Sequence, residues 1–426
     1  MSLSTPFKIA IIGGGISGLS TALFIHHFCS HQNIQIDIYE KADSYRDVGA
    51  GLTIGVNAAK LLHLIGLGDA LNAISGSRDG IWFTIRRLDT NKEVTTIHSN
   101  DSDQIRQASV SRSGLLNILL KSITERKAAT LHNNKQFLST KDLGHETKII
   151  FSDSTSTTAN LLLASDGIHS LVRNRFVSDS PIYTGKILYR GTIPINSDLK
   201  QIWTLPTYSA MWIDHNKHLI MYSINSNKTL NFVGCVTSPQ NPDITEKESW
   251  STTCSKSEFL SHFQTPSNPL LSQILSLTPS NPSKWIINDR NPIPQWIFYH
   301  GKIVLLGDAA HPMVPHQSAG AGQAIEDGYI LAKALSDYLS DSDSGLEKYM
   351  SLYQKVRLPR TTTLQTQSRD AGNLFHLNAS SMKGKSFDDR LKILSETIKK
   401  RLESIWTEDL DVLYDKEKAS NIRKKI

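Results

Sequence analysis

Residues 7–18 read Phe7-Lys8-Ile9-Ala10-Ile11-Ile12-Gly13-Gly14-Gly15-Ile16-Ser17-Gly18. The apolar run at 7–12 predicts a buried strand, and Gly13, Gly15 and Gly18 give the G-x-G-x-x-G spacing at a turn into a helix. In such a turn the first glycine permits the bend, the second lets the backbone approach a pyrophosphate, and the third lets the helix pack on the strand. The phosphates then lie at the helix N-terminus, where free N–H groups favour negative charge. The stretch therefore predicts a dinucleotide-binding unit rather than an ordinary glycine-rich turn.

Three further apolar runs also end in acidic residues or glycines. Ile34–Tyr39 is followed by Glu40, about 20 residues beyond Gly18, where a carboxylate can hold ribose hydroxyls and would repel the 2′-phosphate of NADPH. Two later runs are Leu161-Leu162-Leu163-Ala164-Ser165-Asp166-Gly167 and Ile303-Val304-Leu305-Leu306-Gly307-Asp308-Ala309-Ala310-His311-Pro312. Strand ends of this kind predict one extended dinucleotide site, and flavin adenine dinucleotide (FAD) is the ligand that fits them.

The composition is that of an ordinary globular enzyme. The chain has 426 residues, 39% of them hydrophobic and 20% charged, which is enough for a substantial core. The net charge of +6 is scattered, with no basic stripe interleaved with aromatics, so we expect no nucleic-acid partner. The charge suits anionic ligands and equally a solvated surface. Cys29, Cys235 and Cys254 match no disulfide or metal framework, and no stretch reaches membrane-spanning length. We therefore expect a cytoplasmic protein without membrane association or metal.

The pattern along the chain predicts an α/β (α+β) fold in interleaved segments. The spacing of leucines predicts a helix over Ala58–Leu71, and Ile81–Leu88 and Glu93–Ile97 read as paired strands. A helix is expected from Leu115, with Ser113 as its N-cap. We expect a Rossmann-like FAD-binding domain of several segments, an inserted, mainly antiparallel β-sheet substrate domain and a helical C-terminal region. The predicted segments are 1–78, 105–182 and 286–360 for FAD, 79–104 and 183–285 for substrate, and 361–426 for the C-terminal helices.

These motifs resemble those of the class A flavoprotein aromatic hydroxylases, the para-hydroxybenzoate hydroxylase-like group. Within it the chain is similar to the salicylate hydroxylases and related fungal FAD-dependent monooxygenases. The resemblance extends over roughly residues 7–360. The matching stretches are Gly13–Gly18 with Glu40, Val48-Gly49-Ala50-Gly51-Leu52 with Asn57, Arg112 ahead of Leu115-Leu116, Ser165–Ser170 with Arg173, and Gly307–Pro312 continuing through Pro315-His316-Gln317 to Gly320–Asp327.

The chain departs from the family pattern at three places. Val56 precedes Asn57 where the family usually has proline, which leaves the local turn in question. Of the family's His-Arg-x-Asp only Arg112 is present. Ser318 stands where a glycine usually follows His-Gln, which adds a side chain where the backbone passes close to the flavin.

The motifs and the resemblance together assign the FAD contacts. They are Gly13, Gly15, Ser17, Gly18, Glu40, Lys41, Gly51, Arg112, Asp166, Gly167, Asp308, Pro315, Gly320, Ala321 and Gly322. Asp308 would accept from ribose or ribityl hydroxyls, or alternatively cap a helix. Arg112 would offer its guanidinium to the pyrophosphate, or alternatively lie on the surface. The helix opening at Gly320 would direct its N–H groups at the pyrimidine end of the flavin, while Glu326 and Asp327 fit its first turn as structural residues.

The resemblance implies an aromatic hydroxylation in two halves. NADPH or NADH reduces FAD, and O2 then forms a C4a-hydroperoxyflavin that transfers OH to an electron-rich ring carbon of a small phenolic substrate. The protein would exclude water and hold the phenolate. Arg190, Tyr222 and His316 are the candidate catalytic residues: a cation for a phenolate or carboxylate, a hydroxyl donor, and a proton-transfer or orienting group. A surface ion pair for Arg190 and a half-buried sheet position for Tyr222 remain open alternatives.

Three functions stay open at this point. One is salicylate hydroxylase-like chemistry, with decarboxylation if the substrate is salicylate-like. Another is a biosynthetic monooxygenase of secondary metabolism that dearomatises a polyketide phenol or epoxidises an alkene. The third is a flavin-binding protein without monooxygenation. Pocket shape decides among them, and it arises from residues on non-adjacent strands. The oligomeric state is not readable from the sequence.

Overall fold

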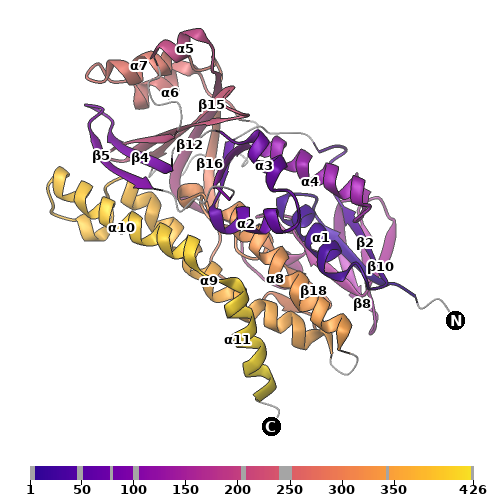
Figure 1. The fold of residues 1–426 in the computed structure, drawn as a ribbon. Coiled ribbons are helices and arrows are strands. Elements are labelled where there is room, and N and C mark those ends of the chain that lie inside the picture. Colours follow the sequence, from indigo (N-terminus) through magenta and orange to yellow (C-terminus); the bar gives the residue numbers. More distant parts are fainter. Residues whose placement is uncertain are drawn as a thin grey trace.

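The computed structural model describes residues 5–45, 51–76, 80–98, 105–202, 208–238, 252–341 and 345–423. Val48, Gly49 and Ala50 of the matching motif lie outside these ranges. The described residues form a nucleotide-binding sheet with covering helices, a larger antiparallel sheet, and a C-terminal group of helices (Figure 1).

The nucleotide-binding sheet has six strands in the order β17-β18-β11-β1-β2-β7. Its strands are β1 (Phe7–Ile12), β2 (Ile34–Tyr39), β7 (Thr130–His132), β11 (Leu161–Ala164), β17 (Ile297–Phe298) and β18 (Ile303–Leu305). All neighbours are parallel except β17 and β18. Every residue of β11 is buried, as expected for a parallel strand covered on both faces. The strands predicted from the motifs are thus confirmed as neighbours, with their ends at one edge.

Helices from distant parts of the chain cover this sheet. They are α1 (Ile16–Cys29), α4 (Arg112–Arg126), α8 (Gly320–Ser340) and α9 (Leu346–Phe375). Helix α1 packs against both α8 and α4. Gly328 makes the first contact possible, because a Cβ there would lie 2.7 Å from the hydroxyl oxygen of Thr21. The start of α8 is therefore held close to the glycine-rich turn that opens α1.

The larger sheet has seven strands in the order β16-β12-β15-β14-β13-β4-β5. They are β4 (Ile81–Arg87), β5 (Glu93–His98), β12 (Ile182–Pro194), β13 (Ser209–Asp214), β14 (Lys217–Ile224), β15 (Thr229–Thr237) and β16 (Ser283–Asp289). All neighbours are antiparallel except β4 and β13. The mainly antiparallel sheet and the pairing of β4 with β5 are as predicted; the exact domain boundaries stay a proposal.

The two faces of the larger sheet have different partners. Helices α5 (Ser197–Ile202), α6 (Lys256–Phe263) and α7 (Pro269–Ser276) lie over one face, where Trp212 and Phe232 are fully buried (Figure 1). On the other face, Leu188 and Cys235 pack against Val314, which belongs to the nucleotide-binding half. That second face therefore looks toward the predicted flavin site.

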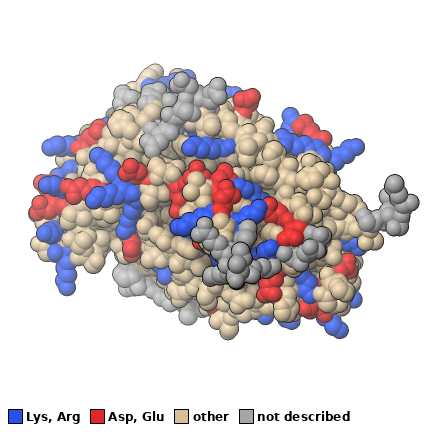
Figure 2. All heavy atoms as spheres, turned by 60° about the horizontal axis from the view of Figure 1, so that its bottom comes forward, with Lys and Arg blue, Asp and Glu red and all other residues tan. Residues whose placement is uncertain are grey.

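The remaining elements complete the structure around these two sheets. Strands β3 (Gly51–Ile54) and β6 (Ala108–Ser111) pair with each other, and β8 (Phe137–Asp142), β9 (Thr147–Phe151) and β10 (Ser156–Ala159) form a third sheet. Helix α10 (Phe387–Thr407) packs along β5, and α11 (Leu410–Arg423) follows it. Among the described helices, none is long and apolar enough to span a membrane. On the face shown in Figure 2, acidic and basic side chains of the described residues are intermixed.

Two local predictions are wrong. The helix expected over Ala58–Leu71 is two helices, α2 (Val56–Leu64) and α3 (Gly68–Ile74), because the chain turns at Gly66 with φ of +73°. Helix α4 begins earlier than expected, and its cap is Ser111, whose Oγ accepts from the Gly114 N–H at 3.1 Å. The spacing of leucines revealed neither the break at Gly66 nor the start of α4.

Candidate FAD and substrate site

The glycine-rich turn has the geometry that the spacing predicted. Gly13 has φ of +102°, and a Cβ there or at Gly18 would overlap backbone or side-chain atoms. A Cβ at Gly18 would meet the carbonyl oxygen of Gly13 and lie 2.7 Å from the Ser165 hydroxyl. A Cβ at Gly15 would instead meet nothing within 4 Å. The turn is closed on the protein side and open at Gly15, where a pyrophosphate could approach.

Glu40 closes the turn from the end of β2. Its carboxylate oxygens accept from the backbone N–H groups of Gly14 at 2.8 Å and Ala42 at 3.0 Å. Lys41 beside it is exposed. Ser17 is buried, and its hydroxyl has no hydrogen-bond partner in the described part of the chain. Because a Cβ at Gly307 would lie 2.8 Å from that hydroxyl, Ser17 joins the first and third motifs.

The second motif lies directly beside the first. Ser165 Oγ donates to the carbonyl of Gly13 at 2.9 Å or of Ile12 at 3.0 Å. The carboxylate of Asp166 accepts from Ser170 Oγ at 2.5 Å and from the Leu171 N–H at 2.8 Å, and burial raises the pKa of this carboxyl. Its main bonds are therefore to its own turn. Gly167, with φ of +82° and open space around it, is the member of this motif that a cofactor can approach.

The third motif brings Asp308 and Arg112 into one neighbourhood. The Asp308 side chain is exposed, yet protein encloses it on most sides and limits its hydration. Desolvation by the surrounding protein raises the pKa of the Asp308 carboxyl, and the nearby His311 and Arg112 oppose the shift. Arg112 is half-buried at the start of α4 and forms no ion pair with the described residues. A half-buried guanidinium that pairs with no acid among the described residues can bind an anionic ligand.

The start of α8 presents unused backbone donors. Gly320, Ala321 and Gly322 open this helix, and neither a side-chain cap nor an acidic residue satisfies its first turn. The free N–H groups and the dipole of this 21-residue helix favour an anion there. Pro315 is exposed just before it, and Ser318 has φ of +52°. That left-handed conformation explains why a glycine is usual at this position and indicates local strain for the serine.

A buried ionic network fixes α8 in place. Asp327 accepts from the Gly307 N–H at 2.9 Å and from Arg357 Nε at 2.8 Å, and lies 2.6 Å from His311 Nε2. Glu326 pairs with Arg357 at 2.5 Å and with Arg360 at 2.8 Å. Burial raises the pKa of both carboxyls, but Arg357 and Arg360 outweigh it at Glu326, and His311 and Arg357 outweigh it at Asp327, so both pKa values fall. Both acids are therefore structural, as expected, but lie beyond the first turn where they were predicted.

The larger sheet supplies two of the three candidate catalytic residues. Arg190 on β12 lies over the ring of Trp285, with 5.3 Å from its guanidinium carbon to the ring centre. Tyr222 on β14 lies against the flavin-site strand β3, since a Cβ at Gly51 would be 2.9 Å from its ring. Asn231, which the sequence reading missed, accepts from the Gly51 N–H at 2.9 Å. Only the strand register, with Tyr222 opposite Asn231, could have indicated that residue.

His316 approaches the same face of the sheet from the flavin side. It is buried in the turn η3 (Pro315–Gln317), and its ring centre lies 5.6 Å from that of His218 on β14. Burial lowers the pKa of His316 well below its usual value, and His218 and Lys186 add to the shift. It is therefore a neutral hydrogen-bonding group at pH 7. The sequence did not show this burial, which favours the orienting role over proton transfer.

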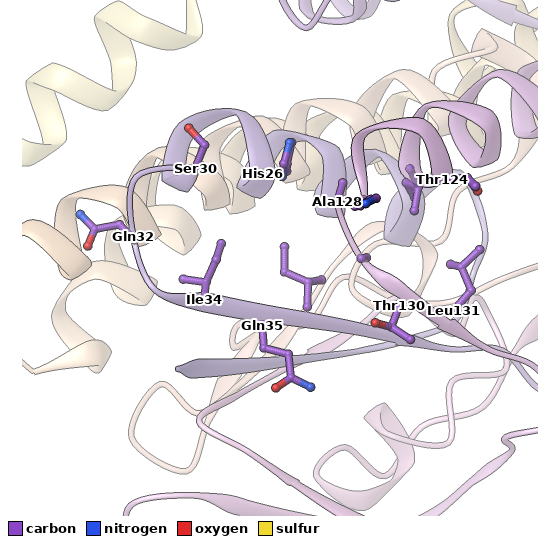
Figure 3. Close-up of a pocket in the computed structure, with 13 residues that line it drawn as sticks. His26, Ser30, Gln32, Ile34, Gln35, Thr124, Ala128, Thr130 and Leu131 are labelled. Atoms are coloured by element: carbon purple, nitrogen blue, oxygen red, sulfur yellow. The ribbon is translucent and has the colours of Figure 1, made fainter. Parts of the chain in front are cut away.

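A separate hollow of about 660 Å³ opens between α1, α4, β2 and β7. Figure 3 shows side chains such as His26, Gln35 and Thr130 around it. None of the predicted cofactor or substrate residues lines this hollow. It is not part of the candidate site.

Comparison with known proteins identifies the family. A family model described as an FAD binding domain matches residues 7–368. The chain belongs to this family. The 6-methylsalicylate 1-monooxygenase atA of Aspergillus terreus is 31% identical, over 96% of this chain and 91% of the relative. A salicylate hydroxylase of Pseudomonas putida is 28% identical, over 95% of this chain and 93% of the relative. A solved salicylate hydroxylase substrate complex has a TM-score of 0.82 at 25% identity, covering 97% of this chain and 98% of that one.

This member of the FAD binding domain family is an FAD-dependent monooxygenase of the aromatic hydroxylase type, with FAD as its cofactor. NAD(P)H is the typical co-substrate of the family. The residues present fit FAD: the space at Gly15 is open, the Ser17 hydroxyl is unpartnered, and the start of α8 is uncapped. The predicted fold class and cofactor are thereby confirmed.

Proposed function

We propose that this monooxygenase hydroxylates a small phenolic acid of the salicylate type, with NAD(P)H and O2 as co-substrates. One observation carries the proposal: Arg190 and Tyr222 come from the face of the larger sheet that looks toward the flavin site, and His316 meets the same face. Cationic, hydroxyl and imidazole groups together suit a phenol with an acidic substituent. The names of the relatives, which act on salicylate and 6-methylsalicylate, support this substrate class.

The cofactor contacts follow from the groups that the protein leaves available. Backbone at Gly13, Gly15 and Gly18, with the Ser17 hydroxyl and Arg112, would hold the pyrophosphate. The side chains of Glu40 and Asp308 would accept from ribose or ribityl hydroxyls, and Lys41, Gly167 and Pro315 would line the edges. Asp166 would contribute through its backbone, since its carboxylate bonds its own turn.

The start of α8 would face the pyrimidine end of the flavin. Its uncapped N–H groups at Gly320, Ala321 and Gly322 would stabilise negative charge that builds up on the ring. Gly51 would pass close to the ring, because Tyr222 and Asn231 hold its strand from the other side. FAD held by these residues would supply acceptance of a hydride from NAD(P)H and activation of O2 for hydroxylation of the aromatic ring.

The protein's own part in the reaction is to hold the substrate and exclude water. Arg190, braced on Trp285, would attract the anionic group or phenolate. Tyr222 would donate a hydrogen bond to the phenolic oxygen beside Gly51. His316, neutral because of burial, would orient the substrate as donor or acceptor and not as a cation. The apolar side chains of Leu188 and Val314 would keep water from the reacting carbon.

The second candidate is oxidation of a larger phenol in secondary metabolism. A relative named dual trans-enoyl reductase/FAD-dependent monooxygenase tazHJ, of Aspergillus terreus, favours it, at 28% identity over 96% of this chain and 60% of the relative. Both candidates use the same site and differ in the size of the aromatic ring system accepted.

Aerobic NAD(P)H consumption by the purified yellow protein tests the proposal. The panel contains salicylate, 6-methylsalicylate, other phenolic acids and larger polyketide phenols, with products identified by mass. Oxygen gained with carbon dioxide lost from salicylate supports a salicylate hydroxylase, and oxygen gained only on larger phenols supports the second candidate. An Arg190→Ala variant should retain FAD but lose substrate-stimulated consumption. Failure of every phenol to stimulate the protein would refute both candidates.

A further inference from the structure

Lys186 is a buried lysine that pairs with no carboxylate among the described residues, and burial lowers its pKa. It lies on β12, and its side chain is only 7% exposed. Its one hydrogen bond in the described structure is to Asn373 Oδ1 at 2.8 Å, which is a neutral acceptor. No carboxylate among the described residues pairs with it. A buried charge without a counter-ion costs several kcal/mol of folding free energy, so this lysine needs an explanation.

Three imidazoles surround the same region. The ring of His218 lies with its centre 5.6 Å from that of His316 and 5.0 Å from that of His376. Two buried nitrogens, His218 Nδ1 and His376 Nε2, have no hydrogen-bond partner in the described residues. Burial lowers the pKa of His218 to about 3, and Lys186 adds to this shift. The imidazoles are therefore neutral and offer unused hydrogen-bonding atoms.

A glycine brings the lysine and the loop histidine together. A Cβ at Gly372 of α9 would lie 2.6 Å from the ring of His316 and 3.0 Å from Cε of Lys186. Any larger residue there would displace one of the two groups. Because His316 belongs to the turn that precedes α8, the Lys186 side chain extends toward the flavin side of the sheet. Lys186, Leu188 and Arg190 share this face of β12, as alternate residues of a strand do.

Lys186 and Arg190 are well separated on this face. Four residues along a strand span about 13 Å, with Leu188 and its partner Val314 between them. Lys186 is grouped with His218 and His316, whose imidazoles it influences electrostatically. The Arg190 guanidinium lies over Trp285 of β16, on the side of β12 away from β14.

We propose that Lys186 is a specificity-determining residue, whose ammonium group, with the imidazoles of His218 and His316, receives the carboxylate of the substrate. The proposal rests on the proposed function and deepens it, since it assigns the substrate carboxylate to Lys186 and leaves Tyr222 for the phenolic oxygen. An incoming carboxylate supplies the missing counter-ion and acceptors for the unused nitrogens.

A metal ion is the competing occupant. His218, His316 and Cys235 place three possible ligand atoms within 4.8 Å of one another. The ammonium of Lys186 beside them repels a cation and attracts an anion, which favours the carboxylate. Burial also raises the pKa of the Cys235 thiol to about 12, so the thiolate that a metal needs is disfavoured.

The test compares salicylate with salicylamide, which has the same phenol but a neutral amide. Their affinities for the FAD-loaded wild type and Lys186→Met are measured from the change in flavin absorbance. We expect Lys186→Met to weaken salicylate binding by about 30-fold or more, and salicylamide binding by less than about threefold. Lys284→Met is the matched control, because Lys284 lies on the neighbouring strand and pairs with Glu258 at 3.1 Å. The control should change neither affinity.

Melting temperatures supply the second readout. Without ligand, Lys186→Met should melt at the same or a higher temperature than the wild type, because an uncompensated charge is removed; a purely structural lysine would give a lower one. Salicylate should raise the melting temperature of the wild type and not that of the variant. Equal losses for both ligands, no loss for either, or stabilisation of the wild type by zinc chloride but not by salicylate would overturn the subsite. Wild type that turns over no phenol refutes the proposed function itself, whereas turnover of salicylate with no effect of Lys186→Met refutes only the subsite.

Discussion

The side-chain oxygen of Asn231, on β15 of the larger sheet, accepts a hydrogen bond from the backbone N–H of Gly51 at 2.9 Å. The two residues belong to different halves of the fold, so this bond ties the larger sheet, which would face the substrate, to strand β3, which would lie beside the flavin. Asn231 is only 1% exposed, and water cannot easily replace the bond.

Asn231→Ala should therefore loosen β3 and weaken FAD binding. We expect a loss of about 1–3 kcal/mol in unfolding free energy and about a tenfold rise in the FAD dissociation constant, measured by flavin fluorescence. The control is Asn160→Ala, because Asn160 accepts from the Lys8 N–H at 2.8 Å in the same way, remote from Gly51. Asn160→Ala should lower the unfolding free energy but leave FAD affinity unchanged. Equal FAD affinity in both variants would contradict the role given to Asn231.

Gly15 and Gly18 should respond differently to alanine. A Cβ at Gly18 would overlap the Gly13 carbonyl, so Gly18→Ala should destabilise the protein even without FAD. Gly15 has an ordinary φ of −77° and open space around it, so Gly15→Ala should change apo stability by less than about 0.5 kcal/mol. Its FAD affinity should still fall about tenfold or more, since only the cofactor would meet the new methyl group. Thermal melts with and without FAD check both, and unchanged FAD binding by Gly15→Ala would remove Gly15 from the pyrophosphate site.

Arg357 should be among the most costly side chains to remove. It is fully buried and pairs with both Glu326 and Asp327, so Arg357→Met leaves two carboxylates short of a partner. We expect a loss of about 3–5 kcal/mol in urea unfolding, or a failure to accumulate soluble protein. Lys121→Met, which breaks the exposed pair with Glu125 at 3.7 Å, should cost less than about 1 kcal/mol. A small effect of Arg357→Met would mean that water reaches the network.

The buried histidines should make stability depend on pH. The pKa of His218, His316 and His376 is lowered by burial, below the value of about 6.5 in the unfolded chain. Below pH 6.5 the unfolded chain therefore binds up to three more protons than the folded protein. Their contribution to stability is fully present above pH 6.5 and is lost as pH falls toward 3, by about 1.4 kcal/mol per proton per pH unit.

Urea unfolding at saturating FAD between pH 5 and 7.5 measures this slope. His376→Phe should lower it by about one proton, whereas His145→Asn, at an exposed position, should leave it unchanged. A flat profile in the wild type would show that the cluster is hydrated or already charged.

Sequence reasoning predicted the geometry of the glycine-rich turn far better than the arrangement of side chains on the larger sheet. Gly13, Gly15 and Gly18 lie in one continuous turn, so their spacing encodes the geometry directly. Asp166 was placed correctly beside that turn, but its carboxylate bonds Ser170 and Leu171, a local competition that the motif does not reveal.

Lys186, His218 and Asn231 were missed for a different reason. They come from three strands, and only the register of those strands and the position of α9 bring them to one face. Lysine side chains are rarely buried, so the sequence alone predicts a surface position for Lys186. These side chains become buried only when the strands and α9 assemble. The neutral state of His316 follows from that burial.

The strand order of the nucleotide-binding sheet determines how long the edge of β1 stays unpaired during synthesis. Strand β1 lies between β2, which follows it closely in the chain, and β11, which begins only at Leu161. At ribosomal speeds of about 5–20 residues per second, one edge of this apolar strand stays unpaired for roughly 7 to 30 seconds. Open edges of that kind recruit other chains. Residues 7–12 are therefore the part of this sheet that most needs protection during synthesis, until their second neighbour emerges.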